Sequence, residues 1–566
     1  LTLSFRFFRR MEAWPAWMSD RPGSAIYKKS LVQKYPFNEK LRRYEDAECQ
    51  YEILNNVEVY QSKVPVMISN RDASEAASYR KDIGEDFLGH LNFKGKSFWE
   101  RMMLYKLARQ AVNTNPFEMT EQEGMMDGYA IGGLITAMEK TVFPTGTQAD
   151  DTDPVNQYQI AYNLSGDAWS GYIGMNNNFG GNSHLNYVLK DEWISSTFRN
   201  SYTNLLDPWK KLTAYANQYN SPEIAAIAQV LKISGWHKVL ECFGPIPYSK
   251  AGSGEINVPY DSEKDVYKGM LSDLEAAVTV LTPLAKAGVK VLGDYDLVYE
   301  GNTTRWVKYA NSLMLRLAMR LREARDAEMQ SWSKEYVEKA LKHDIGVMTE
   351  VQDAAAAGTG AGISLRNPLF WISDNYNDAR VGTTILSYLT GYNDPRLSAY
   401  CLPVHAECTV GVTAFDGKKY QGVPMGHSYS RSDDKSWYKD SYYFYSKPNL
   451  TANSPLYWMR TSEVLFLRAE AALYYGAEFG DAEALYKAGI AMSFAENGVQ
   501  GSVDSYMNSG KTPSAVENSS RYYGYPSPAP CETTAQFSGS TEQKLEKIMI
   551  QKYIAMFPNG QEAWTE

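Results

Sequence analysis

The sequence predicts a mainly α-helical protein, in which paired helices stack into a tetratricopeptide-like scaffold and long irregular segments lie between helices. Apolar residues recur at spacings of three and four over several stretches, which is the period of a helix with one buried face. Capping residues precede these stretches and Gly or Pro follows them. Two segments, 358–393 and 401–455, lack this period and are rich in aromatic residues. Long loops are usually functional or disordered, and these contain too many aromatics for disorder.

Size and charge limit the classes of protein that fit. The chain has 566 residues and a net charge of −9. Because one hydrophobic core stops growing near ~250–300 residues, we expect more than one packing unit. Nucleic-acid binding needs a basic surface, so the acidic balance argues against it and suits neutral ligands. No apolar run is long enough to span a membrane as a helix.

Residues 1–112 differ from the rest and predict a partial α/β fragment. A charged helical run is followed by an extended, Val- and Ile-rich segment, 57–68, and a basic helical stretch, 98–111. Residues 17–27, 35–41 and 44–48 resemble the C-terminal end of a family-2 glycosyltransferase. The resemblance makes Asp46 a candidate general base, since deprotonating a sugar hydroxyl requires a nearby carboxylate.

The nucleotide-binding half of such an enzyme, with its Asp-x-Asp motif, would precede Leu1 and is absent. We therefore expect residues 1–112 to be a vestigial or mis-joined piece, with a genuine fusion as the alternative. On this view the second piece spans residues 113–566.

Three helices are predicted in the first half of that piece. Ser221 as N-cap and Pro222 in the first turn begin one, which ends at Gly244. A second helix spans 261–281 and ends at Thr282-Pro283. Thr303 or Thr304 caps the third, where the apolar stripe consists of Trp306, Ala310, Leu313, Leu317 and Leu321. We expect Arg316, Arg320 and Arg322 to form a charged flank of this helix.

A helix pair of tetratricopeptide length is predicted near the C-terminus. One stripe, Val464, Leu467, Ala471 and Tyr474, ends at Gly476. Asp481 caps the next helix, whose predicted buried face is Leu485, Ala488, Met492 and Ala495. A last helix spans 541–557, with Leu545, Met549, Tyr553 and Met556 on one face. Because one helix pair cannot bury both faces, several pairs should stack into a curved scaffold.

Several stretches in the same order resemble the SusD/RagB superfamily, and within it the starch-binding-associating branch. They are residues 143–151, 162–172, 244–248, 376–380, 391–396 and 459–470, the last reading Met-Arg-Thr-Ser-Glu-Val-Leu-Phe-Leu-Arg-Ala-Glu. The resemblance covers about four fifths of the chain. It implies a non-catalytic nutrient-binding protein with a tetratricopeptide-like core and an irregular, ligand-facing half.

The resemblance also implies where the protein works and with which partners. A lipid anchor would hold it on the outward face of a Bacteroidetes-type outer membrane. Its partner would be a SusC-like, TonB-dependent barrel, and its ligand an oligosaccharide or a peptide. The family's lipidated cysteine is missing from this sequence, and the C-terminus is expected to be shorter than usual for the family.

Three aromatic clusters are candidate ligand-binding sites, because sugar rings need flat aromatic platforms and nearby polar groups. The third cluster, in the least patterned part of the chain, is the favoured ligand or partner surface. The alternative for the first cluster is packing against the core, and for the third cluster internal packing or contact with the barrel. The candidates are Trp169 and Tyr172; Trp371, Asn375 and Tyr376; and Trp437, Tyr438, Tyr442, Tyr443 and Tyr445.

Signals for catalysis are weak, so we predict no enzyme, cofactor or metal site. The six His are scattered and none lies in an HExxH motif. There is no CxxC pair, and Cys401 and Cys408 either form a short disulfide loop or remain thiols. Two rival hypotheses are a glycosyltransferase fragment that uses Asp46 and a helical-repeat adaptor that binds only proteins.

Overall fold

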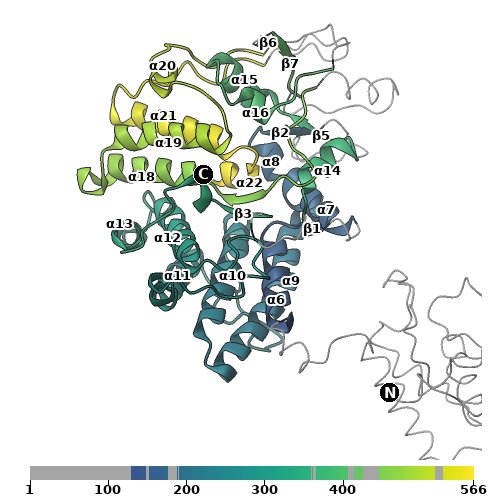
Figure 1. Ribbon diagram of the computed structural model, residues 1–566, viewed down its shortest axis with the longest axis vertical. Coiled ribbons are helices and arrows are strands. Elements are labelled where there is room, and N and C mark those ends of the chain that lie inside the picture. Colours follow the sequence, from purple (N-terminus) through teal and green to yellow (C-terminus); the bar gives the residue numbers. More distant parts are fainter. Residues whose placement is uncertain are drawn as a thin grey trace, which may run out of the picture. The chain divides into compact units, whose positions relative to one another are not determined.

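The computed structural model describes residues 129–147, 152–175, 188, 190–358, 360, 365–405, 413–415, 417–424, 445–516 and 527–566. All of them belong to one compact unit, Asp127–Glu566. They form the mainly helical fold that the sequence predicts, with a few short strands (Figure 1). No helix in this described part is long and apolar enough to cross a membrane. The transferase-like segment 1–112, including Asp46, lies outside the described residues.

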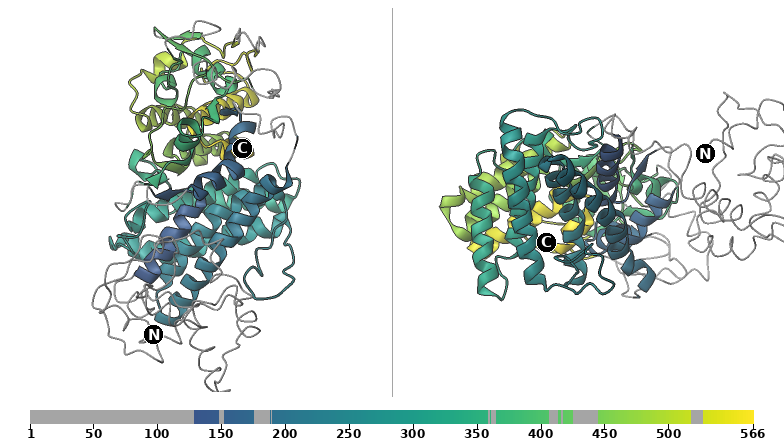
Figure 2. Two further views of the ribbon diagram at one scale, coloured as in Figure 1. Left: turned by 90° about the vertical axis from the view of Figure 1, so that its right-hand side faces the viewer. Right: turned by 90° about the horizontal axis from the view of Figure 1, so that it is seen from below.

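The first half of the unit is an array of long helices packed side by side (Figures 1 and 2). From α9 to α13, each helix contacts the next one along the chain, and α6 packs against α9 and α10. This is the stacking expected of helix pairs that each bury one face. The helices are α6 (Tyr129–Val142), α9 (Asp191–Tyr219), α10 (Pro222–Phe243), α11 (Glu263–Lys286), α12 (Thr303–Arg320) and α13 (Ala327–Lys342).

The helix α10 has the predicted bounds, whereas two other boundaries differ. Asn302 caps α12, because its side-chain oxygen accepts a hydrogen bond from Arg305 N at 3.1 Å. The hydroxyls of the predicted caps Thr303 and Thr304 instead donate to carbonyls before the helix. Pro283 does not end α11, which continues to Lys286. Proline removes only its own N–H from the helix, and here it stands in the last turn.

The second half contains a helix pair, α18 and α19, with α21 packed against both (Figure 1). Asp481 caps α19 as predicted, by accepting from Ala484 N at 3.0 Å. The α19 face that is buried differs from the prediction by about one residue: Ala495 is exposed and Ala488 only half-buried. Gly489 determines which face of α19 packs on α18, because a Cβ at this position would lie 2.7 Å from the ring of Phe466 on α18.

The second half includes α18 (Thr461–Tyr475), η9 (Ala477–Phe479), α19 (Ala482–Glu496), α20 (Val503–Met507), α21 (Thr541–Met556) and α22 (Gly560–Thr565). The stripe of α18 is buried except for Tyr474, which is 47% exposed at the helix end.

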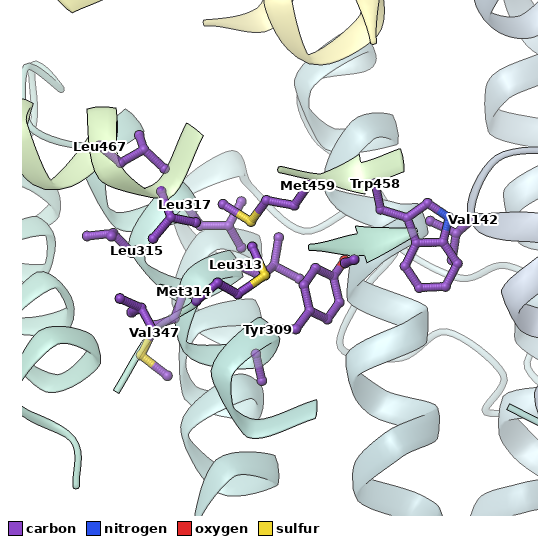
Figure 3. Packing of buried hydrophobic residues seen from close by; sticks show 14 of the residues in the cluster. Val142, Tyr309, Leu313, Met314, Leu315, Leu317, Val347, Trp458, Met459 and Leu467 are labelled. Carbon is purple, nitrogen blue, oxygen red and sulfur yellow. The ribbon is translucent and has the colours of Figure 1, made fainter. Parts of the chain in front are cut away.

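A continuous core joins the two halves. Figure 3 shows Tyr309, Leu313 and Leu317 of α12 beside Trp458 and Met459. The last two belong to β8 (Leu456–Met459), which precedes α18 in the sequence and pairs with β3 (Ala355–Ala357). The predicted apolar stripe of α12 is therefore confirmed as the core side of that helix.

Short elements gather at one side of the helices (Figure 1). Only some of them, namely β4, α14, β5, α15, β6 and β7, fall in the segments 358–393 and 401–455 that were predicted to be irregular. Three antiparallel pairs join β1 to β4, β2 to β5 and β6 to β7. The strands are β1 (Gly146–Thr147), β2 (Ile173–Met175), β4 (Leu365–Arg366), β5 (Ala379–Val381), β6 (Thr413–Phe415) and β7 (Lys418–Tyr420). The short helices are α7 (Asp153–Tyr158), η5 (Gln159–Asn163), α8 (Gly166–Trp169), η8 (Val351–Asp353), α14 (Pro368–Asp374), α15 (Thr383–Gly391) and α16 (Leu397–Tyr400).

Candidate ligand-binding face

The second predicted aromatic cluster lies at the C-terminal end of α14. Asn367 begins this helix by accepting from Phe370 N at 3.1 Å, and Pro368 occupies its first turn. Trp371 lies in the helix, Asn375 is its C-cap, and Tyr376 follows. Trp371 and Tyr376 are half-buried, whereas Asn375 is exposed. The structure therefore brings two rings and one exposed amide together at a helix end.

Charged and polar contacts hold this cluster in place. The guanidinium carbon of Arg366 lies 4.4 Å from the centroid of the Trp371 ring, a cation–π contact. Tyr376 donates its hydroxyl proton to Asn156 Oδ1 on α7 at 3.0 Å. Lys447 Nζ lies 2.6 Å from Asp374 Oδ1. Contacts from three separate segments thus fix the rings before any ligand arrives. Sequence reasoning missed Arg366, because nothing local in the sequence places it beneath Trp371.

The strand β5 joins all three predicted clusters. It pairs with β2, with Met175 opposite Ala379 at the end of the segment that holds the first cluster. Val381 N donates to Ser446 O at 2.9 Å, next to the last residue of the third cluster. Val423, which precedes residues 425–444 in the sequence, donates its N–H to Val381 O at 2.8 Å. The described ends of these aromatic-rich segments therefore meet beside α14.

Two predicted ligand contacts are buried side chains instead. Tyr172 is fully buried, its hydroxyl donates to Tyr553 O, and its ring packs against Phe557 at 5.3 Å between centroids. Tyr445 is 3% exposed. Neither offers a ring face to a ligand here.

Trp169 is half-buried and packs against Trp564 of α22, with 4.7 Å between ring centroids. This contact matches the packing alternative for the first cluster. The remaining candidates of the third cluster, Trp437, Tyr438, Tyr442 and Tyr443, lie outside the described residues. We call the described part, formed by Arg366, Trp371, Asn375 and Tyr376, the α14 face.

Arg316 and Arg320 of α12 form buried ion pairs, and the half-buried Arg322 just after the helix forms another, which corrects the prediction of a charged flank. Arg316 is 1% exposed and donates two hydrogen bonds to Glu463 on α18, at 2.7 and 2.9 Å. Arg320 donates to Glu562 on α22 at 2.8 Å. Arg322 lies 2.7 Å from the carboxylate of Glu470. Each arginine connects the first helical array to an element of the second half.

One group within this network has the spacing of a metal site. His237, Glu241 and Glu562 each offer a ligand atom, and these atoms lie within 4.8 Å of one another. However, the guanidinium of Arg320 contacts both carboxylates. Burial alone would raise the pKa of Glu562, but the charges of Arg316 and its neighbours hold it well below its ordinary value. Arginine thus already supplies the positive charge, and the group fits an ion-pair network rather than a metal site.

Half-buried rings and an exposed amide on a stacked helical scaffold are the kinds of group that line ligand-binding sites. The family model described as SusD-like, "Susd and RagB outer membrane lipoprotein", matches residues 111–566. The chain belongs to this family, whose members are non-catalytic binding proteins.

Solved structures of SusD homologues share the fold. The chitin-binding homologue from Flavobacterium johnsoniae is 31% identical over 77% of this chain and 85% of its own, with a TM-score of 0.67. A homologue from Bacteroides ovatus is 31% identical over 78% and 85%, with a TM-score of 0.68. One from Bacteroides vulgatus is 29% identical over 78% and 86%, with a TM-score of 0.69. No curated protein matches the sequence significantly.

Proposed function

We propose that this protein binds an oligosaccharide at the α14 face and delivers it, unaltered, to an outer-membrane transporter. The observation that carries this proposal is the convergence of three aromatic-rich segments on β5, beside a half-buried Trp371 and an exposed Asn375. Family membership supports a binding role, and one homologue of the same fold is described as chitin-binding.

The chemistry of the α14 face suits a neutral sugar. The apolar C–H face of a pyranose packs on an aromatic ring, and an amide both donates to and accepts from hydroxyls. Arg366 holds Trp371 before binding, which lowers the entropy lost when a ligand orders the ring. A net charge of −9 would not repel a neutral ligand.

The membrane location and the transporter partner follow from the family rather than from the α14 face. The family is one of outer-membrane lipoproteins, and we infer a lipid-anchored position on the outward surface. The partner we infer is a SusC-like, TonB-dependent barrel. Co-purification of the tagged chain with a barrel encoded beside its gene tests this part, and reproducible recovery without any barrel would contradict it.

A glycan array and a matched peptide panel, probed with the full chain, test the ligand class. We expect binding to one family of oligosaccharides and chromatographically unchanged ligand after long incubation. Binding of peptides alone would replace glycan with peptide as the nutrient, and cleavage of the bound glycan would contradict a non-catalytic role.

A further inference from the structure

A cavity of about 150 Å³ lies where both halves of the fold meet, and Asn375 is not among its lining residues. Phe143 after α6 and Leu369 of α14 supply apolar walls. Tyr457 of β8 and Arg460 after it supply a ring and a cation. Asn497 and Asn559 are partly exposed at its rim, so the cavity opens to solvent.

Arg460 is a buried cation in the wall of this cavity, and one of its guanidinium nitrogens has no hydrogen-bond partner among the described residues. It is 8% exposed, and its Nη1 is buried without a hydrogen-bond partner in the described part of the chain. Its guanidinium carbon lies 3.9 Å from the centroid of the Tyr457 ring. Stacking uses the flat face of the guanidinium and leaves the N–H groups at its edge available.

The nearest acidic side chain in the cavity wall serves another purpose. Glu496 accepts hydrogen bonds from Ser462 N at 3.1 Å and from Ser462 Oγ at 2.5 Å. Its carboxylate thereby satisfies the N-terminus of α18, as a capping group does. Among the described residues no carboxylate lies within ion-pair distance of Arg460. Its charge acts on Glu496 at longer range, where it opposes the rise that burial causes in the pKa of that carboxyl. A buried guanidinium without a close counter-charge is unfavourable, and an anion in the cavity would relieve this.

We propose that this cavity is a second binding site, specific for the carboxylate of a small ligand unit. A planar carboxylate matches the two parallel N–H groups of a guanidinium edge, which gives strong and directional pairing. A cavity of this size accommodates a molecule of roughly benzene size. It therefore takes one end unit of a ligand, with Phe143 and Leu369 against its C–H groups, while the rest of the ligand passes through the rim.

A uronic acid sugar and the C-terminus of a peptide each carry such a group. Both share the carboxylate that Arg460 would recognise. The site does not depend on the proposed α14 face, because it uses none of that face's residues and involves a charged unit rather than a neutral ring.

Calorimetry on the full wild-type chain tests the site without any mutation. The probes are sodium D-galacturonate against D-galactose, and the dipeptide Ala-Ala against its C-terminal amide. We expect at least one carboxylate to bind about tenfold or more tightly than its neutral counterpart, because the neutral molecule cannot form the charged pair with Arg460. Preference for galacturonate indicates a uronic acid, and preference for Ala-Ala a peptide end. Equal binding within both pairs, or no binding at all, would overturn the proposal.

Variants then assign the effect to the cavity. Arg460→Lys keeps the charge but loses the planar edge, and we expect carboxylate affinity to fall about tenfold. Because Arg460 is buried, Tyr457→Leu provides a second test, since it removes the stacking ring from a half-buried strand position. Tyr260→Ala, in the exposed α10–α11 loop, is the matched control. Unchanged carboxylate affinity in a folded Arg460→Lys or Tyr457→Leu variant would contradict the assignment.

Discussion

Replacement of Glu562 by glutamine probes the contact that joins the two halves of the fold. Glu562 is fully buried on α22 and lies 2.9 Å from His237 Nε2, 2.8 Å from Arg320 Nη2 and 3.4 Å from Arg316 Nη1. Glutamine keeps the shape but removes the negative charge. It also turns an N–H group toward one of these donor groups.

The magnitude follows from this burial. Removing one partner of a buried ion pair leaves a buried charge uncompensated and costs about 3–5 kcal/mol. Here Arg316 retains Glu463, and Arg320 retains Glu241 and Glu566, so we expect the lower part of this range. Urea unfolding at pH 7, followed by tryptophan fluorescence, measures the change in the free energy of unfolding.

A matched control and a pH series sharpen the test. Glu328→Gln removes an exposed carboxylate that pairs with Lys264 at 2.7 Å, and we expect no measurable change. Because the folded-state pKa of Glu562 lies below its ordinary value of 4.5, its stabilising effect is present above that value and disappears as the pH falls. The gap between wild type and Glu562→Gln should therefore narrow in acid. Equal effects of the two substitutions, or a gap independent of pH, would refute this reasoning.

Three further changes test other parts of the account. Gly560→Ala would place a Cβ 2.3 Å from the Cα of Asp167, so the backbone must shift. Urea unfolding should show a loss of about 1–3 kcal/mol in the free energy of unfolding. An unaltered unfolding midpoint would be inconsistent with this packing. Burial raises the pKa of Asp167 to about 7, despite the hydrogen bond from Tyr158, so its contribution to stability is present below pH 3.8 and is lost as the pH rises toward 7. Asp167→Asn should therefore gain stability over wild type at pH 8 relative to pH 4, and a constant difference between these two pH values would count against it. Arg366→Met should lower glycan affinity about 2–5-fold in calorimetry, because it releases the Trp371 ring. Circular dichroism verifies that the variant is folded. Full affinity in a folded variant would show that the cation is not needed.

Local sequence signals placed the predicted helices close to their observed positions, whereas α6, α9 and α13 were not predicted. Ser221 and Pro222 begin α10, Asp481 caps α19, and the last predicted helix agrees with α21 within one residue. Capping and hydrophobic periodicity act over a few residues, so both are readable without the fold. The one-residue shift of the buried face of α19 was not readable, because it depends on the fit of Gly489 against Phe466.

The buried ion pairs and the candidate site needed the fold. Arg316 looks like a surface residue in sequence because its partner Glu463 lies 147 residues away. The cluster on α14 was visible from Trp371, Asn375 and Tyr376 alone. Its connection to the other two clusters depends on the long-range pairing of β2 with β5, which no local pattern predicts.

Calorimetric titration of the strongest ligand from the glycan array, with wild-type protein, Trp371→Ala and Tyr260→Ala, tests the central claim most directly. Tyr260 is 64% exposed in the α10–α11 loop and serves as a control for loss of an exposed ring. Loss of one stacking platform should weaken binding by about 0.5–1.5 kcal/mol, roughly two- to twelvefold in Kd, in Trp371→Ala only. Wild-type affinity in Trp371→Ala, or an equal loss in Tyr260→Ala, would contradict glycan binding at the α14 face.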